Sequence, residues 1–582
     1  MIPRAEHPNP QFKRSEWLNL NGIWEFEIDK SVSGKAKRFF ERAHLSGSIT
    51  VPFCPESKLS GVGDTDFLNC VWYRRDIEIP TEWKSGRVLL HFGAVDHTAT
   101  VYINGKEVCR HKGGYASFSV DITPHLNGER ASLCVCAEDN TRDGRYASGK
   151  QSPEYASHGC FYTRVTGIWQ TVWLEHVPDA YIRSVRLTPD VDNSALSLEA
   201  EVVGKGELDA VALFEGKIVG SVRLQHTQGG RLRGVLPLSE LYLWEVGNGR
   251  LYDLQLSFGK DRVHSYFGMR SVGFDGYRFL LNGKSVFQRL VLDQGYYREG
   301  LYTAPTEEDL IRDIKISMDV GFNGARLHQK VFEPLFLYHC DKMGYLVWGE
   351  YGSWGIKEDS LEALPPMIAE WREIVERDYN HPAIVGWCPL NEIWAGAHKG
   401  VPNYDILRSV YHLTKALDPS RPCIDSSGGY HTECTDLYDI HDYVQDTAVF
   451  AEMFGNPDAS EMLSAWKKHP RAMTATRTGR YTVGQPLFVS EYGGIKWDIE
   501  RSNSDAWGYG NAPVTEEEFK KRYKGLTDTL LDNPCMFGLC YTQLYDIEQE
   551  VNGLYTYDRK PKFADMDFFR KVNARKAKTE ES

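Results

Sequence analysis

The sequence predicts two antiparallel β sandwiches followed by a (β/α)8 barrel, and three patterns along its 582 residues indicate this order. Short strands with alternating side chains and Asn-Gly turns fill the first part of the chain. A second all-β segment repeats this character over a shorter stretch. Amphipathic helices then alternate with short apolar strands, which is typical of parallel βαβ units. We therefore expect domains at residues 1–178, 179–273 and 274–582.

The first domain is predicted from strands in which polar and apolar side chains alternate. Residues 22–28 and 71–77 show this period, and residues 101–103 lead into the turn Asn104-Gly105. Turns of this kind join neighbouring antiparallel strands. The pattern therefore indicates an antiparallel sandwich.

The second domain shows the same alternation on a smaller scale. Residues 196–202 alternate strictly, and residues 210–214 form another strand-like run. A unit of about 95 residues with such strands fits a seven-strand immunoglobulin-like sandwich.

The third domain is predicted from the alternation of helix and strand patterns. Residues 307–320 have helical periodicity and precede a short strand at 324–327. A second helical pattern at 366–379 precedes the apolar strand 384–387. The length of the segment suits one (β/α)8 barrel, whose chemistry takes place at the C-terminal ends of its strands.

Composition excludes several classes of function. The formal net charge of −13, without a basic stripe, argues against a nucleic-acid partner. The chain has no apolar run of membrane-spanning length and no secretion signal at its start, so we expect a cytoplasmic protein without a membrane partner. The 12 cysteines form no C-x-x-C pair, which favours reduced thiols over disulfides or metal clusters. No metal-ligand spacing is visible, so we expect no metal and no cofactor.

Two glutamates stand out in the barrel because each ends a short apolar run bounded by Pro or Gly. Glu392 ends the run 386–392, and Glu491 lies in 486–494. Each run is typical of a buried parallel strand that carries a carboxyl group at its tip. A buried carboxylate is costly without a partner or a task. Two carboxylates of this kind are the minimum requirement for glycoside hydrolysis.

Further motifs accompany the glutamates in a fixed order. They are Val71-Trp72-Tyr73-Arg74-Arg75, Val101-Tyr102-Ile103-Asn104-Gly105, Gly321-Phe322-Asn323-Gly324-Ala325-Arg326-Leu327-His328, Asn391-Glu392 and Ser490-Glu491-Tyr492-Gly493. Over nearly the whole chain this set resembles glycoside hydrolase family 2, the retaining exo-glycosidases that include β-galactosidases, β-glucuronidases and β-mannosidases. The resemblance implies a jelly-roll sugar-binding domain, an immunoglobulin-like sandwich and a catalytic (β/α)8 (TIM) barrel.

The resemblance also implies roles for individual residues. Glu392 falls at the position of the acid/base, and Glu491 at that of the nucleophile. Asn391 would bind the 2-hydroxyl of the sugar. Tyr492 would orient the nucleophile through its hydroxyl group, and Arg326 would pair with Glu491 and keep it ionised.

Other polar and aromatic residues follow predicted strands and are expected around the mouth of the pocket. The candidate substrate-binding residues of this group are Asp293, His328, Glu350, Trp354, His441 and Trp507. Trp394 and Trp497 are further candidates for stacking on a sugar ring. For each of them a purely structural role is the alternative.

The expected substrate is a small oligosaccharide or glycoside, and the leading hypothesis is a retaining exo-β-glycosidase of β-galactosidase type. The Asn-x-Lys motif with which β-glucuronidases hold the substrate carboxylate is absent, because Asn552-Gly553-Leu554 contains no lysine. This favours a neutral sugar, with Arg298 as the alternative carboxylate-binding residue. Open alternatives are a β-glucuronidase, a β-galacturonidase or an α-L-arabinopyranosidase of the same family, a catalytically inactive carbohydrate-binding protein, and a metal-dependent hydrolase. A homo-oligomer is also left open.

Overall fold

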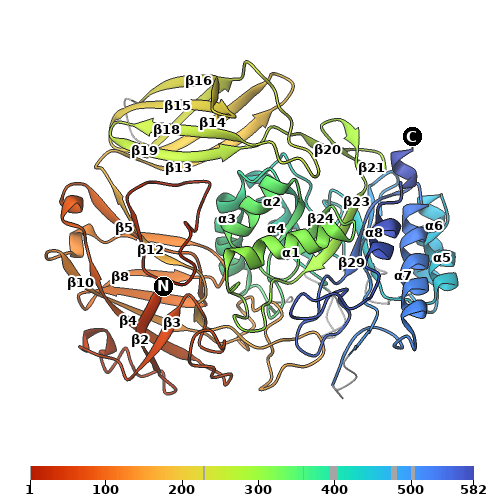
Figure 1. The fold of residues 1–582 in the computed structure, drawn as a ribbon, viewed down its shortest axis with the longest axis horizontal. Coiled ribbons are helices and arrows are strands. Elements are labelled where there is room, and N and C mark those ends of the chain that lie inside the picture. Colours follow the sequence, from red (N-terminus) through yellow and green to blue (C-terminus); the bar gives the residue numbers. More distant parts are fainter. Residues whose placement is uncertain are drawn as a thin grey trace.

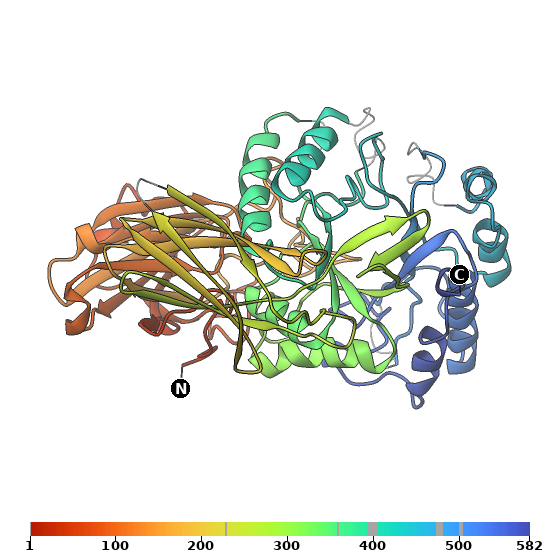
Figure 2. The same ribbon diagram turned by 90° about the horizontal axis from the view of Figure 1, so that it is seen from above.

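The computed structural model describes residues 2–226, 230–357, 360–393, 404–472, 481–499 and 505–581. Figure 1 shows three bodies: two β sandwiches, drawn in red to yellow, and a helix-covered barrel, drawn in green to blue. Seen from above in Figure 2, both sandwiches lie on the same side of the barrel.

The first domain is a sandwich of two antiparallel sheets. One sheet has the order β1 (Trp17–Asn19), β12 (Val172–Val177), β5 (Arg87–Phe92) and β9 (Phe118–Asp121). The other has the order β3 (Gly47–Val51), β2 (Gly22–Ile28), β4 (Cys70–Glu78), β10 (Arg130–Glu138), β7 (Thr98–Ile103) and β8 (Lys106–Lys112). A small pair, β6 (Val95–Asp96) and β11 (Gly167–Ile168), lies beside them. The alternating apolar side chains of both sheets meet in one core, as the sequence period requires.

The second domain packs a three-stranded sheet against a four-stranded sheet. The first has the order β13 (Tyr181–Asp190), β14 (Ala195–Val203) and β17 (Gly230–Pro237). The second has the order β16 (Lys217–His226), β15 (Gly206–Phe214), β18 (Tyr252–Phe258) and β19 (Asp261–Phe267). Their inward-facing aliphatic side chains form a separate core.

A small sheet of β20 (Val272–Asp275), β21 (Arg278–Leu281) and β22 (Lys284–Ser285) leads into the barrel. The barrel strands are all parallel: β23 (Gln288–Asp293), β24 (Gly324–Leu327), β25 (Leu346–Glu350), β26 (Ile384–Cys388), β27 (Tyr438–Asp442), β28 (Leu487–Gly493) and β29 (Met536–Thr542). Between β26 and β27, residues 423–427 form parallel bridges to the β26 side of the sheet, at Trp387 and Asn391. This segment occupies the remaining strand position of a (β/α)8 barrel.

The helices cover the outside of the barrel: α1 (Glu307–Asp319), α2 (Pro334–Met343), α3 (Leu364–Asp378), α4 (Tyr404–Leu417), α5 (Thr447–Phe454), α6 (Ala459–Lys468), α7 (Glu516–Leu531) and α8 (Asp567–Asn573). Local sequence fixes their ends. Thr306 and Asp309 form a reciprocal capping box at the start of α1, and Gly344 ends α2 with a left-handed φ of 68°.

The fold predicted from the sequence is confirmed, including the helix-and-strand alternation of the barrel. All 12 cysteines are free thiols in the structure. Among the described residues, no helix combines the length and the apolar character needed to cross a lipid bilayer.

Candidate active site

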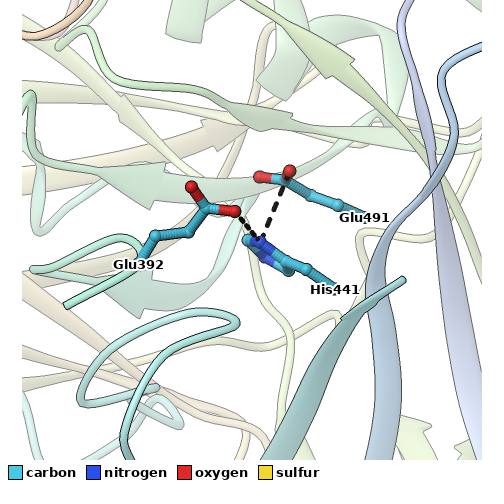
Figure 3. A group of neighbouring side chains, drawn as sticks. All are labelled: Glu392, His441 and Glu491. Atoms are coloured by element: carbon cyan, nitrogen blue, oxygen red, sulfur yellow. Dashed lines mark hydrogen bonds and ion pairs between the residues drawn. The ribbon is translucent and has the colours of Figure 1, made fainter. Parts of the chain in front are cut away.

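The two glutamates singled out in the sequence lie together at the C-terminal end of the barrel. Glu491 is part of β28, and Glu392 follows β26 at a left-handed φ of 52°, where its backbone N–H donates to the carbonyl of Ser427 at 2.8 Å. Figure 3 shows that His441, from β27, faces both carboxyl groups. Its Nδ1 lies 2.7 Å from Oε1 of Glu392 and 3.4 Å from Oε2 of Glu491.

The spacing of the two carboxyl groups carries chemical information. One oxygen of Glu392, one of Glu491 and a ring nitrogen of His441 lie within 4.8 Å of one another. Retaining glycosidases hold their two carboxyl groups about 5–5.5 Å apart, whereas inverting enzymes need about 6.5–9.5 Å to admit a water molecule. The observed spacing therefore suits the retaining arrangement.

Glu491 is held in its ionised form by neighbouring donors. Nη1 of Arg326 lies 3.2 Å from Oε1, and the hydroxyl group of Tyr443 donates to Oε2. Burial alone would raise the pKa of Glu491, but the charges of His441, His328 and Arg326, together with the Tyr443 hydrogen bond, lower it below its usual value. An ionised and oriented carboxylate is what a nucleophile requires.

Arg326 is itself fixed by a second carboxylate. Its Nη2 donates to Oε2 of Glu350 at 2.7 Å, and its Nη1 donates to the backbone carbonyl of Ser490 at 2.8 Å. Nδ1 of His328 lies 2.9 Å from the other oxygen of Glu350. Burial alone would raise the pKa of Glu350, but its contacts with Arg326 and His328 hold that pKa at about 2. Glu350 therefore balances the charge of Arg326.

His441 has polar partners at both ring nitrogens. Its Nε2 lies 3.0 Å from the hydroxyl group of Ser427, which donates to Asp439 at 2.6 Å, and 3.4 Å from Nη1 of Arg326. Its Nδ1 faces the glutamates on the other side of the ring, 2.7 Å from Oε1 of Glu392. Burial would lower the pKa of His441, but Glu491 and Glu392 raise it.

The same three side chains, Glu392, His441 and Glu491, could offer ligand atoms to a cation. Metal binding requires a neutral imidazole nitrogen with a free lone pair. Here the raised pKa of His441 favours its protonated form, and Arg326 already pairs with Glu491. The group therefore fits proton chemistry better than metal binding, while the expected absence of a metal stays a prediction.

The side-chain amide of Asn391 has a donor, Nδ2, that is available to a ligand. Its Oδ1 accepts from Nη2 of Arg326 at 3.1 Å, and its backbone N–H donates to Ser353 at 3.1 Å. Nδ2 is buried and has no hydrogen-bond partner among the described residues. A buried donor without a partner is costly, so a substrate hydroxyl at this point would satisfy it. The predicted contact with the 2-hydroxyl remains a prediction.

The role assigned to Tyr492 is wrong. Its hydroxyl group lies 2.9 Å from Oγ1 of Thr527 on α7, on the outside of the barrel. Successive strand residues point to opposite faces, so the neighbour of an inward-pointing Glu491 must point outward. Tyr443 provides the hydroxyl group instead, with its ring stacked on Tyr509 at 3.4 Å between centroids. Its place two residues after His441, at the end of β27, was the available signal.

Two further candidates serve other contacts. Asp293 accepts from the backbone N–H of Gly295 at 2.9 Å and from the hydroxyl group of Tyr545, and burial together with Asp313 raises its pKa to about 6. Arg298 is half exposed and donates to Asp558 at 2.7 Å. In the described structure neither residue bonds to Glu392 or Glu491.

The tryptophan candidates lie in different surroundings. The ring of Trp354 lies 5.3 Å from that of Phe161. The ring of Trp507 lies edge-on to Tyr509 at 4.9 Å, and Tyr509 stacks on Tyr443. Trp497 packs on Phe563 within the hydrophobic core. Trp394 lies outside the described residues.

A loop of the first domain, residues 148–163, contacts this end of the barrel, and we call it the docking loop. The backbone N–H of Ser148 donates to the carbonyl of Trp354 at 2.7 Å. The hydroxyl group of Tyr162 donates to Glu550, and Nε2 of Gln549 donates to the carbonyl of Phe161 at 3.0 Å. The loop brings Lys150 next to Trp354, its Nζ lying 4.0 Å from the centre of the ring. Nothing in the local sequence connects this loop with the barrel.

A TIM barrel with two carboxyl groups at retaining distance, one of them ionised by Arg326 and Tyr443, defines a glycoside hydrolase. The family profile described as "Glycosyl hydrolases family 2, sugar binding domain" matches residues 18–178. The profile described as "Glycosyl hydrolases family 2, TIM barrel domain" matches residues 275–573. The chain belongs to glycoside hydrolase family 2, as its motifs predicted.

Similar proteins include several β-glucuronidases. One from Paenibacillus borealis is 24% identical over 94% of this chain and 95% of its own length, and one from Sus scrofa is 27% identical over 71% and 69%. Among solved structures, a β-glucuronidase of an uncultured Clostridium sp. superposes with a TM-score of 0.78 at 21% identity, covering 97% of this chain and 99% of that one. A β-glucuronidase from Ruminococcus gnavus in complex with D-glucuronic acid gives 0.76 at 19% identity, covering 98% and 100%.

Proposed function

We propose that the protein is a retaining exo-β-glycosidase that removes terminal β-D-glucuronic acid. The expectation of a β-galactosidase-type enzyme is not supported, because the relatives named above are β-glucuronidases. The observation that carries the catalytic part of the proposal is the short distance between Glu392 and Glu491 around His441.

The first step forms a covalent glycosyl-enzyme. The ionised carboxylate of Glu491 attacks the anomeric carbon while Glu392 donates its proton to the glycosidic oxygen, which leaves as an alcohol. Arg326 and Tyr443 hold the two oxygens of Glu491, so the attack begins from a fixed orientation. The amide Nδ2 of Asn391 is placed to donate to the sugar as charge develops on it.

The second step releases the sugar. Glu392, now a carboxylate, removes a proton from a water molecule, and the resulting hydroxide attacks the anomeric carbon from the face that the aglycone left. The bond to Glu491 breaks, and its carboxylate is restored. Two inversions give a product with the configuration of the substrate.

A panel of nitrophenyl glycosides tests the proposal. It contains the β-D-glucuronide, β-D-galacturonide, β-D-galactoside and α-L-arabinopyranoside, with Glu491→Gln protein as the blank. We expect the glucuronide to have the highest kcat/KM and NMR to detect the β-anomer first. A neutral glycoside at the top would overturn the substrate assignment, and no turnover with intact sugar binding would favour an inactive carbohydrate-binding protein.

A further inference from the structure

One cation, Lys150 beside Trp354, has no oxygen partner among the described residues. Lys150 of the docking loop is 6% exposed, and among the residues that the structure describes its ammonium group makes no hydrogen bond and no ion pair within 4.0 Å. Its contact is the face of the Trp354 ring, 4.0 Å from Nζ. Burying an ammonium group is costly unless an anion or several acceptors surround it. Lys150 therefore retains three donors for a ligand.

The surroundings keep Lys150 charged. Burial would lower its pKa, but Cys160, Glu550, Glu491 and Glu392 raise it above its usual value. The ammonium group also lies near the site by geometry, because it contacts the ring of Trp354 and the preceding residue, Ser353, accepts from the backbone N–H of Asn391 at 3.1 Å. A protonated lysine in this position offers a compact positive charge to a substrate.

The backbone holds Lys150 in place. Its carbonyl accepts from the N–H of Tyr162 at 2.8 Å, and the preceding Gly149 donates to the carbonyl of Gly352 at 3.0 Å. Gly149 has a left-handed φ of 57°, and a Cβ atom there would lie 2.4 Å from the carbonyl oxygen of Gln329. Only glycine fits such a close approach, so the position of Lys150 relative to the barrel is set by the main chain.

We propose that Lys150 binds the carboxylate of the β-D-glucuronide and so replaces the missing Asn-x-Lys lysine with a cation from the sugar-binding domain. The inference rests on the proposed function, which requires a carboxylate-binding group. In Asn552-Gly553-Leu554, Leu554 stands at the position of the lysine, and Nδ2 of Asn552 already donates to Glu550 at 2.9 Å. Arg298 is engaged by Asp558.

Glu550 lies nearby and could repel an anionic sugar, but its environment limits that effect. One oxygen accepts from Asn552, and the other accepts from the hydroxyl group of Tyr162. Burial raises the pKa of Glu550 above its usual value, against the opposing influence of Lys150. A carboxyl group with raised pKa and two donors presents less negative charge to a ligand than a solvated one.

A matched pair of substrates tests the proposal on the full-length protein. Nitrophenyl β-D-glucuronide and nitrophenyl β-D-glucoside share ring stereochemistry and differ in the group on C5, a carboxylate or a CH₂OH. We expect Lys150→Met to lower kcat/KM for the glucuronide by about 10- to 100-fold, the value of a hydrogen bond to a charged group. The glucoside should change less than about 3-fold, as for a residue without a contact to it. Lys106→Met, on an exposed residue of β8 in the same domain, is the control and should leave both rates unchanged.

A binding measurement covers the case in which Lys150→Met loses all turnover. In Glu491→Gln protein, calorimetry should show that D-glucuronate binds more tightly than D-glucose, and adding Lys150→Met should remove this preference. Equal losses for the two glycosides, or a preference that survives without Lys150, would overturn the role of Lys150. Wild-type protein that cleaves neutral glycosides but no glucuronide would instead refute the proposed function, whatever the variant does.

Discussion

Two Tyr→Phe substitutions, each of which removes a single hydroxyl group, test how Glu491 is held. Tyr443 donates to Oε2 of Glu491 although 48 residues separate them, whereas Tyr492 is the next residue in the chain and bonds to Thr527. Tyr443→Phe removes a donor from a buried, ionised carboxylate. Hydrogen bonds to charged groups contribute about 1.5–3 kcal/mol, so we expect kcat/KM to fall about 10- to 100-fold.

The pH dependence gives a second measurement. The Tyr443 hydrogen bond favours the ionised form of Glu491, so its loss raises the pKa of that carboxyl group. Glu491 then ionises only at higher pH, and the acidic limb of the pH profile of kcat/KM shifts to higher pH. In Tyr492→Phe the acidic limb should stay in place, and kcat/KM should remain within about 3-fold of wild type. The free energy of unfolding should fall by about 1 kcal/mol, because the hydrogen bond to Thr527 is lost.

Rates of aryl β-D-glucuronide hydrolysis across the acidic and neutral pH range, together with urea unfolding, distinguish the two variants. Equal activity losses in both variants, or a larger loss in Tyr492→Phe, would refute the assignment of Tyr443 as the donor.

Three further substitutions test the catalytic assignments. Glu491→Gln should reduce turnover by about 10³-fold or more because the covalent route is lost, and a fluorinated mechanism-based glycoside should label Glu491 in the wild type; a label elsewhere would contradict its role. Glu392→Ala should slow substrates with poor leaving groups far more than activated aryl glycosides, with azide restoring activity, whereas equal losses would indicate a structural role. Arg326→Met leaves two buried carboxylates without their cation, so it should cost about 3–5 kcal/mol in unfolding free energy and move the acidic limb upward. An unchanged limb would mean that Arg326 does not act on the nucleophile.

The sequence predicted those parts of the site that depend on a local residue pattern. An apolar run that ends in a carboxyl group identifies a barrel strand and its tip, and this was enough to bring Glu392 and Glu491 together. The role of Arg326 was predicted from the resemblance to glycoside hydrolase family 2, because the strand pattern alone would also fit a structural ion pair. The fold followed from the same periodicities, because the change from period two to alternating helices and strands marks the start of the barrel.

The contacts that sequence reasoning missed depend on side-chain direction and on distant segments. Tyr492 is adjacent to the nucleophile in the chain but points to the opposite face of β28, whereas Tyr443 reaches it from the neighbouring strand. Lys150 approaches from another domain, and its contact with Trp354 spans about two hundred residues of chain. No local period encodes such an approach, because loop packing is set by tertiary contacts.

Because the docking loop belongs to the first domain and contacts the barrel, both domains contribute residues to the surroundings of the active site. Main-chain hydrogen bonds from Ser148 and Gly149 to the barrel mean that the geometry around Trp354 exists only while the two domains are associated. Catalytic selectivity is thereby a reporter of interdomain association and should decline under mild denaturation before the barrel itself unfolds.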